Sequence, residues 1–112
     1  MLRTFVESSA FSHRVNKERS GLLREIQEEI LENPSCGRII QGTSGLRKAR
    51  FGDESRGKGK RGGFRVIFLD LPHVERTYLL AIYDKSEKDD ISSDEKKILR
   101  DLVARLKREA EK

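Results

Sequence analysis

The stretch Phe64–Leu69 constrains the fold most, because it is apolar at every position except Arg65. A short apolar run rich in aromatic and β-branched residues predicts a strand. The segments on either side, residues 46–51 and 75–83, also alternate in the way that predicts strands, and a turn at Pro72 separates the last two. Three consecutive strands with short connections predict an antiparallel meander.

The remaining apolar residues predict helices around these strands. A short first strand over residues 2–6 precedes a helix that begins at Ser8 or Ser9, and a second helix begins after Ser20 and ends before Pro34. Residues 35–45 are predicted to form a loop. Ser92 and Glu95 have the spacing of a capping box at the start of a last helix. Its apolar stripe is expected to hold Ile98, Leu99, Leu102, Val103 and Leu106.

This order, β-α-α-β-β-β-α, predicts an α+β fold in one domain over residues 1–112. We expect the two early helices to cover one face of the sheet and the last helix to pack at an end or edge. With 35% apolar and 38% charged residues, a chain of 112 residues can bury only a small core.

No apolar run approaches the roughly 20 residues of a membrane helix, and the first residues do not resemble a signal peptide. We therefore expect a soluble, cytoplasmic protein. Cys36 is the only cysteine, which excludes an intramolecular disulfide and a thiolate zinc site. His13 and His73 are predicted to be surface residues, and no metal or cofactor is expected.

Positive charge is concentrated in residues 47–65, which hold eight basic and two acidic side chains. This local excess of six charges exceeds the net charge of +5, so the rest of the chain is about neutral. Cations concentrated on one segment indicate a site for a polyanion, most commonly nucleic acid. The alternative is a mobile, solvated hairpin tip in which glycines serve the backbone conformation alone.

Alternation along the strands assigns these cations to faces. Lys48 and Arg50 share one face of their strand, and Arg65 and Tyr83 lie on the same face of the next two strands if the registers align. We expect these four side chains to meet in an open concavity. Its rim would hold Lys58, Lys60 and Arg61, and Lys85 would lie just past the last strand. The opposite face, buried against helices, would carry Ala49, Phe51, Val66, Phe68, Leu80 and Ile82.

A glycine pattern and a group of acidic residues each resemble a binding motif, but both have simpler structural explanations. Residues 57–62 match the dinucleotide pattern G-x-G-x-x-G, but they join two antiparallel strands instead of opening a helix. Acidic residues before the last helix are better explained by the helix dipole and solvation than by a metal site. They are Asp84, Glu87, Asp89, Asp90 and Asp94.

The sequence resembles the HigB branch of the RelE-like toxins, which are ribosome-dependent mRNA endonucleases of bacterial toxin–antitoxin pairs. The similarity runs from residues 5–8 through residues 42–50 and 57–67 to residues 82–87. It implies the RelE-like fold and cleavage of mRNA in the ribosomal A site. Catalytic residues implied by the matching positions, together with Tyr83 on the same face, are Lys48, Arg50, Arg65, Tyr83 and Lys85. RNA and ribosome contacts are expected from Arg47, Arg56, Lys58, Lys60 and Arg61.

The resemblance also implies partners. These are a HigA-like antitoxin with a helix-turn-helix, the 70S ribosome and mRNA, with DNA bound only through the antitoxin and no membrane contact. Some relatives carry a tyrosine near the terminal helix, and this chain has none after Tyr83. Lys48, Lys85 and Tyr83 are therefore all candidates for proton transfer. The rival hypothesis is a non-enzymatic RNA-binding or ribosome-associated protein that uses the same cations.

Overall fold

The computed structural model describes residues 3–52, 59, 63–87 and 90–111. Over these residues the elements follow in the order β1 (Thr4–Glu7), α1 (Ser9–Val15), α2 (Leu22–Glu32), β2 (Arg38–Ile39), β3 (Arg47–Phe51), β4 (Phe64–Leu71), the 3₁₀ turn η2 (Pro72–Val74), β5 (Arg76–Asp84) and α3 (Ser93–Ala110). The strands form one sheet in the order β1-β5-β4-β3-β2. β1 pairs with β5 in parallel, and the other pairs are antiparallel. The predicted α+β class and the meander of β3, β4 and β5 are confirmed.

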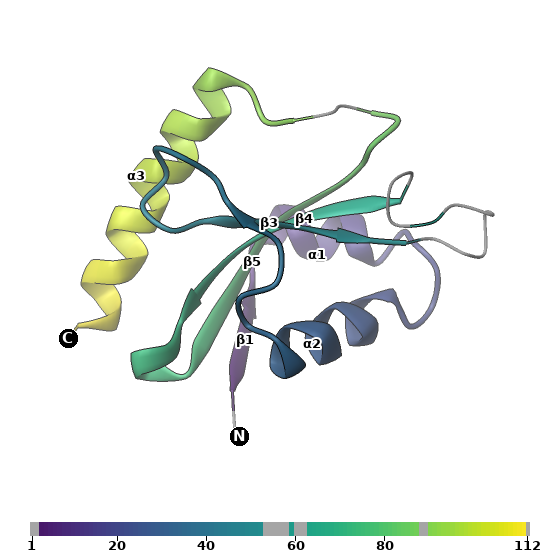
Figure 1. Cartoon of the computed structure of the whole chain (residues 1–112), viewed down its shortest axis with the longest axis horizontal. Coiled ribbons are helices and arrows are strands. Elements are labelled where there is room, and N and C mark those ends of the chain that lie inside the picture. Colours follow the sequence, from purple (N-terminus) through teal and green to yellow (C-terminus); the bar gives the residue numbers. More distant parts are fainter. Residues whose placement is uncertain (1–2, 53–58, 60–62, 88–89, 112) are drawn as a thin grey trace.

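Both faces of the sheet are covered by helices. Figure 1 shows α1 and α2 on one side of the sheet and α3 on the other, and the buried residues form one cluster on each side. The expectation that α3 packs at an end or edge was therefore wrong. β4 carries Val66 and Phe68 toward α1 and α2, and Ile67 and Leu69 toward α3. A strand that is apolar on both faces requires a cover on each of them.

A β-bulge interrupts the pairing of β4 with β5. Ile67 pairs with Ala81 but Phe68 pairs with Leu79, so Leu80 is an extra residue on β5. Beyond the bulge the alternation shifts by one position, and Leu80 joins the cluster beneath α3. The prediction that Leu80 shares a face with Ile82 was wrong, because a strict period of two cannot anticipate a bulge.

The helix ends follow from local hydrogen bonds. The Ser8 hydroxyl accepts from the Phe11 N–H at 3.0 Å, and Ser92 with Glu95 forms the predicted capping box. α2 begins after Gly21 instead of Ser20, and Gly21 has a φ of 88°. Among the described residues no helix is long and apolar enough to cross a membrane.

Two features of the outer elements were not predicted. β2 lies within the expected loop over residues 35–45, and two residues are too few to show a period. Ile98 was expected in the buried stripe of α3, but 69% of its surface is exposed. The helix turns Val103 fully toward the sheet instead, so Ile98 lies at the margin of the stripe.

Candidate functional site

Three predicted site residues lie side by side across the sheet. Arg50 on β3 pairs with Arg65 on β4, which pairs with Tyr83 on β5. Directly opposite residues of antiparallel strands project from the same face and are near neighbours. We call Arg50, Arg65 and Tyr83 the cation row. It lies on the face of the sheet that α3 partly covers, because Tyr83 belongs to the cluster beneath that helix.

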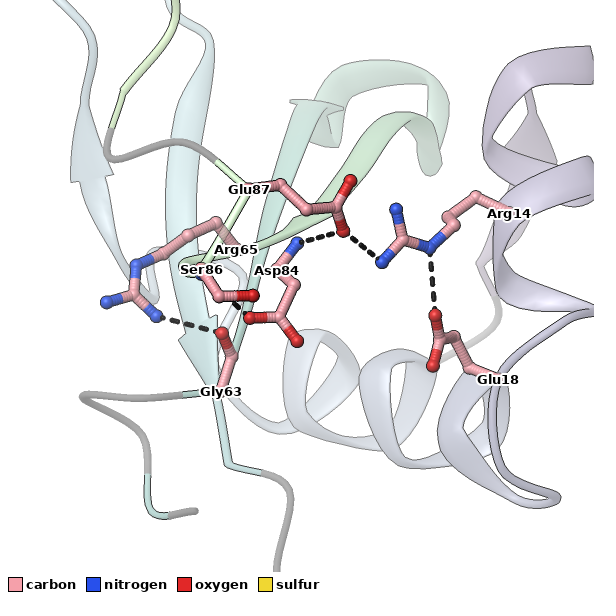
Figure 2. A network of polar contacts seen from close by, with 7 residues as sticks. All are labelled: Arg14, Glu18, Gly63, Arg65, Asp84, Ser86 and Glu87. Carbon is pink, nitrogen blue, oxygen red and sulfur yellow. Dashed lines mark hydrogen bonds and ion pairs between the residues drawn. The ribbon is translucent and has the colours of Figure 1, made fainter. Parts of the chain in front are cut away.

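The cation row is less open than the sequence predicted. Arg50 is exposed, but Arg65 is only 3% exposed and Tyr83 only 5%. Arg65 Nη1 lies 3.5 Å from the carbonyl oxygens of Gly63 and Phe64, and Figure 2 shows the contact with Gly63. The prediction that these side chains meet in an open concavity was therefore wrong, because Arg65 and Tyr83 are buried. Apolar side chains around the buried Tyr83 fix the orientation of its ring. The guanidinium of the row that is accessible to solvent is that of Arg50.

Lys48 precedes Arg50 by two positions and therefore projects from the same face of β3. The residue is 9% exposed, and its Nζ donates to Asp90 Oδ1 at 3.2 Å. Partial burial by itself would raise the pKa of Asp90. Hydrogen bonds from the Ile91 N–H and the Lys48 ammonium outweigh it, so the pKa of Asp90 lies below its ordinary value. Lys48 is thus part of an ion pair.

The carbonyl group of Gly63 contacts both Lys85 and Arg65 of the cation row. Its carbonyl oxygen accepts from the Lys85 N–H at 3.2 Å and also faces the Arg65 guanidinium. A Cβ added to Gly63 would lie 2.1 Å from the carbonyl oxygen of Phe51, so β3 and β4 can approach this closely only with glycine there. The half-buried Lys85 is thereby held at the same end of the sheet as Arg65.

A polar network shapes the turn that contains Lys85. Glu87 Oε1 accepts from the Asp84 N–H at 3.2 Å, and Asp84 Oδ1 accepts from the Ser86 N–H at 2.9 Å. Figure 2 shows that Arg14, on α1, donates to Glu87 and to Glu18. The hydrogen bond from Arg14 lowers the pKa of Glu87, and the same bond raises the pKa of Arg14. This network connects α1 to the segment after β5.

Two cations near Lys48 were not predicted. Arg38 on β2 pairs with Lys48 on β3, so both project from one face of the sheet. A cavity of about 320 Å³ is lined by Arg38 and Lys48, by Asp90 and by Lys96 from α3. A neighbouring cavity of about 410 Å³ is also lined by Arg38 and Lys48, and it extends to Arg50. The sequence placed Arg38 in a predicted loop and Lys96 on a helix with many charged residues. Neither residue therefore stood out from other surface cations in the sequence.

The other predicted residues lie apart from the row or outside the described residues. Arg47 projects from the opposite face of β3, because it alternates with Lys48, and it donates to the Ser35 carbonyl at 3.0 Å. The remaining predicted RNA contacts lie outside the described residues. They are Arg56, Lys58, Lys60 and Arg61, and most of the glycine pattern falls there too. His13 and His73 are exposed, as predicted.

The acidic residues before α3 have separate roles. Asp84, Glu87 and Asp90 each accept from a different group, and Asp94 lies in the first turn of the helix. Within the part of the chain that the structure describes, no three His, Cys, Asp or Glu side chains are placed to hold a metal ion. Asp89 lies outside that part.

The arrangement is chemically suited to an anion with several oxygens. Arg50 is an accessible, permanently charged donor that can bind two oxygens of a phosphate, and the buried Arg65 and the paired Lys48 add positive charge beside it. No known protein-family model matches the sequence.

Proposed function

We propose that this protein is the toxin of a type II toxin–antitoxin pair, with the RelE-like topology, and that it cleaves mRNA in the A site of the ribosome. The observation that carries the proposal is the cation row. Two arginines and a tyrosine from three strands share one face in register, with Lys48 and Lys85 beside them. The family resemblance of the sequence supports the same activity, and the activity implies a cytoplasmic location.

The proposed reaction needs no group beyond these side chains. The ribose 2′-oxygen attacks the adjacent phosphorus, the bond from phosphorus to the 5′-oxygen breaks, and a 2′,3′-cyclic phosphate and a 5′-hydroxyl result. Arg50 and Arg65 stabilise the additional negative charge of the phosphorane, which is usually the largest contribution to catalysis. One proton leaves the 2′-hydroxyl and another reaches the 5′-oxygen. Lys48, Tyr83 and Lys85 are the groups proposed to move them.

The direct test adds the purified protein to ribosomes programmed with mRNA and maps the new 5′ ends. The wild-type protein should cut within the translated frame, and Arg50→Ala should slow cleavage by about 100-fold or more, because one donor to the developing charge is lost. Arg24→Ala is the matched control, since Arg24 is an exposed arginine on α2 that pairs with Glu28. Equal rates for the two variants would remove Arg50 from the mechanism.

A second candidate function is binding without cleavage, as a ribosome-associated or RNA-binding protein. The observation that favours it is the state of two site cations: Arg65 is buried against backbone carbonyls and Lys48 is paired with Asp90. Such contacts are typical of cations that have a structural role. Under this hypothesis the protein binds ribosomes in a salt-sensitive manner and leaves the mRNA intact.

The proposed partner is tested in cells. We expect induction of this gene alone to arrest growth, and co-expression of the neighbouring open reading frame, the proposed HigA-like antitoxin, to relieve the arrest. Any contact with operator DNA is assigned to that partner through its helix-turn-helix. Growth that continues normally on induction would contradict the toxin assignment.

A further inference from the structure

A second pair of cations stands next to the cation row. Lys48 and Arg38 face each other across β3 and β2, just as Arg50 and Arg65 face each other across β3 and β4. Lys48 and Arg50 are two positions apart on one strand, so the two pairs are separated by about 7 Å along β3. This separation is close to that of neighbouring phosphates along an extended nucleic-acid strand.

The second pair lies at a cavity instead of on a flat surface. The cavity of about 320 Å³ is lined by Arg38, Lys48 and Lys96, which come from β2, β3 and α3. Asp90 is the acidic side chain in its lining, so cations are in excess. The Lys48 side chain is only 9% exposed, and it lines this cavity beside Arg38 and Lys96. A partly buried charge is screened less by solvent than a fully exposed one, so it attracts an anion more strongly.

We propose that this cavity is a second phosphate subsite, which holds the backbone phosphate next to the one bound by Arg50 and Arg65. The ligand class is single-stranded RNA, and the inference rests on the proposed function. RNA is chosen over an acidic peptide because it is the substrate of the proposed function, and binding of an acidic peptide is the competing outcome of the test.

Asp90 occupies the subsite when RNA is absent. Its carboxylate accepts from Lys48, yet 59% of the Asp90 side chain is exposed, so the contact can be exchanged for solvent at little cost. An incoming phosphate would take over the Lys48 ammonium and release Asp90. Asp90 is thus a competitor for the ligand, and its removal should strengthen binding.

The test measures binding of a fluorescent pentanucleotide with 2′-O-methyl riboses, which cannot be cleaved by attack of the 2′-oxygen. Fluorescence anisotropy should show binding that is about three- to tenfold weaker for Arg38→Ala and for Lys96→Ala, with the salt slope reduced by about 0.7 for each lost contact. Lys97→Ala is the matched control, because Lys97 is the exposed neighbour of Lys96 on the same helix. It should bind like the wild type, and Asp90→Asn should bind more tightly.

A neutral phosphate analogue locates the contact. One methylphosphonate is placed in turn at each linkage of the pentanucleotide, and the affinities of the wild type and Arg38→Ala are compared. At one linkage the analogue should weaken binding by the wild type and have no further effect on Arg38→Ala. At the adjacent linkage it should weaken the wild type and have no further effect on Arg50→Ala. Circular dichroism and thermal unfolding confirm that each variant is folded.

Several results would overturn the proposal. The first two are equal losses of pentanucleotide affinity in Lys96→Ala and Lys97→Ala, and an unchanged affinity in Arg38→Ala. The third is no binding of the pentanucleotide at low salt. The fourth is that the variants lose affinity only for poly-glutamate, which serves as a model acidic peptide. The ribosome assay separates this inference from the proposed function. Cleavage by wild type with equal losses at Lys96 and Lys97 overturns the subsite alone. Intact mRNA together with the predicted binding losses overturns the nuclease alone.

Discussion

Arg50 and Arg65 face each other directly across β3 and β4, which is an unfavourable arrangement for two like charges. Arg65 is buried and cannot escape into solvent, whereas Arg50 is exposed. Nothing in packing requires a cation at Arg50, because its face of β3 is exposed at that position. The charge of Arg50 is therefore not required by the packing of the fold.

This arrangement predicts that loss of Arg50 stabilises the protein. Arg50→Thr removes the like-charge contact and places a β-branched residue on an exposed strand position. We expect the free energy of unfolding, measured with urea at low salt, to rise by about 0.2–1 kcal/mol. A fall in stability would show that Arg50 has a structural role, and the same experiment in high salt should reduce the gain.

At the scale of elements, the turn after β5 is held from two directions. Gly63 on the β4 side accepts the Lys85 N–H, and Arg14 on α1 pairs with Glu87. Lys85 lies between these two attachments in the sequence. α1 therefore contributes to the site indirectly, by holding the segment that carries Lys85.

The Arg14–Glu87 pair gives this attachment a pH dependence. The pKa of Glu87 is lower in the folded protein, so the stabilisation is full above the ordinary glutamate pKa of about 4.3 and is lost as the pH falls through the folded value. Because both side chains are partly exposed, we expect less than about 1 kcal/mol. Glu87→Gln should destabilise the protein at pH 7, and its difference from the wild type should be smaller at pH 3.

A control separates this pair from a general charge effect. Glu32→Gln removes the same charge at the exposed end of α2, away from the network. Because a negative charge at the C-terminal end of a helix is unfavourable, we expect its removal to raise the stability slightly at pH 7 in urea, opposite in sign to Glu87→Gln. A loss of stability at pH 7 of the same size in Glu32→Gln would contradict the assignment to Glu87.

At the scale of the whole molecule, one sheet separates two apolar clusters. α1 and α2 cover one cluster and α3 covers the other, and β4 contributes to both. Neighbouring side chains of β4 belong to different clusters. Loss of packing on one face therefore disturbs the strand that supports the other, which makes the protein one cooperative unit.

Three isoleucine variants test whether the protein unfolds as one cooperative unit. Ile26→Ala on α2 and Ile67→Ala on β4 empty fully buried positions in different clusters, and each should cost about 2–5 kcal/mol of unfolding free energy. Ile98→Ala is the control at a 69% exposed position and should change stability by less than about 0.5 kcal/mol. Each variant should unfold in one transition by fluorescence and circular dichroism. Separate transitions for the two clusters would contradict a single unit.

The sequence by itself determined the three strands of the meander and the start of the last helix. Alternation and helical spacing are local properties, so β3, β4, β5 and the α3 cap could be predicted. They placed Arg50, Arg65 and Tyr83 on one face only on the condition that the registers align, and the structure supplies that register. The tertiary structure decided the rest. Asp90 reaches Lys48 from 42 positions away, and Arg38 joins them through a two-residue strand. Such contacts depend on the path of the chain and on which face α3 covers, and no local pattern encodes either one.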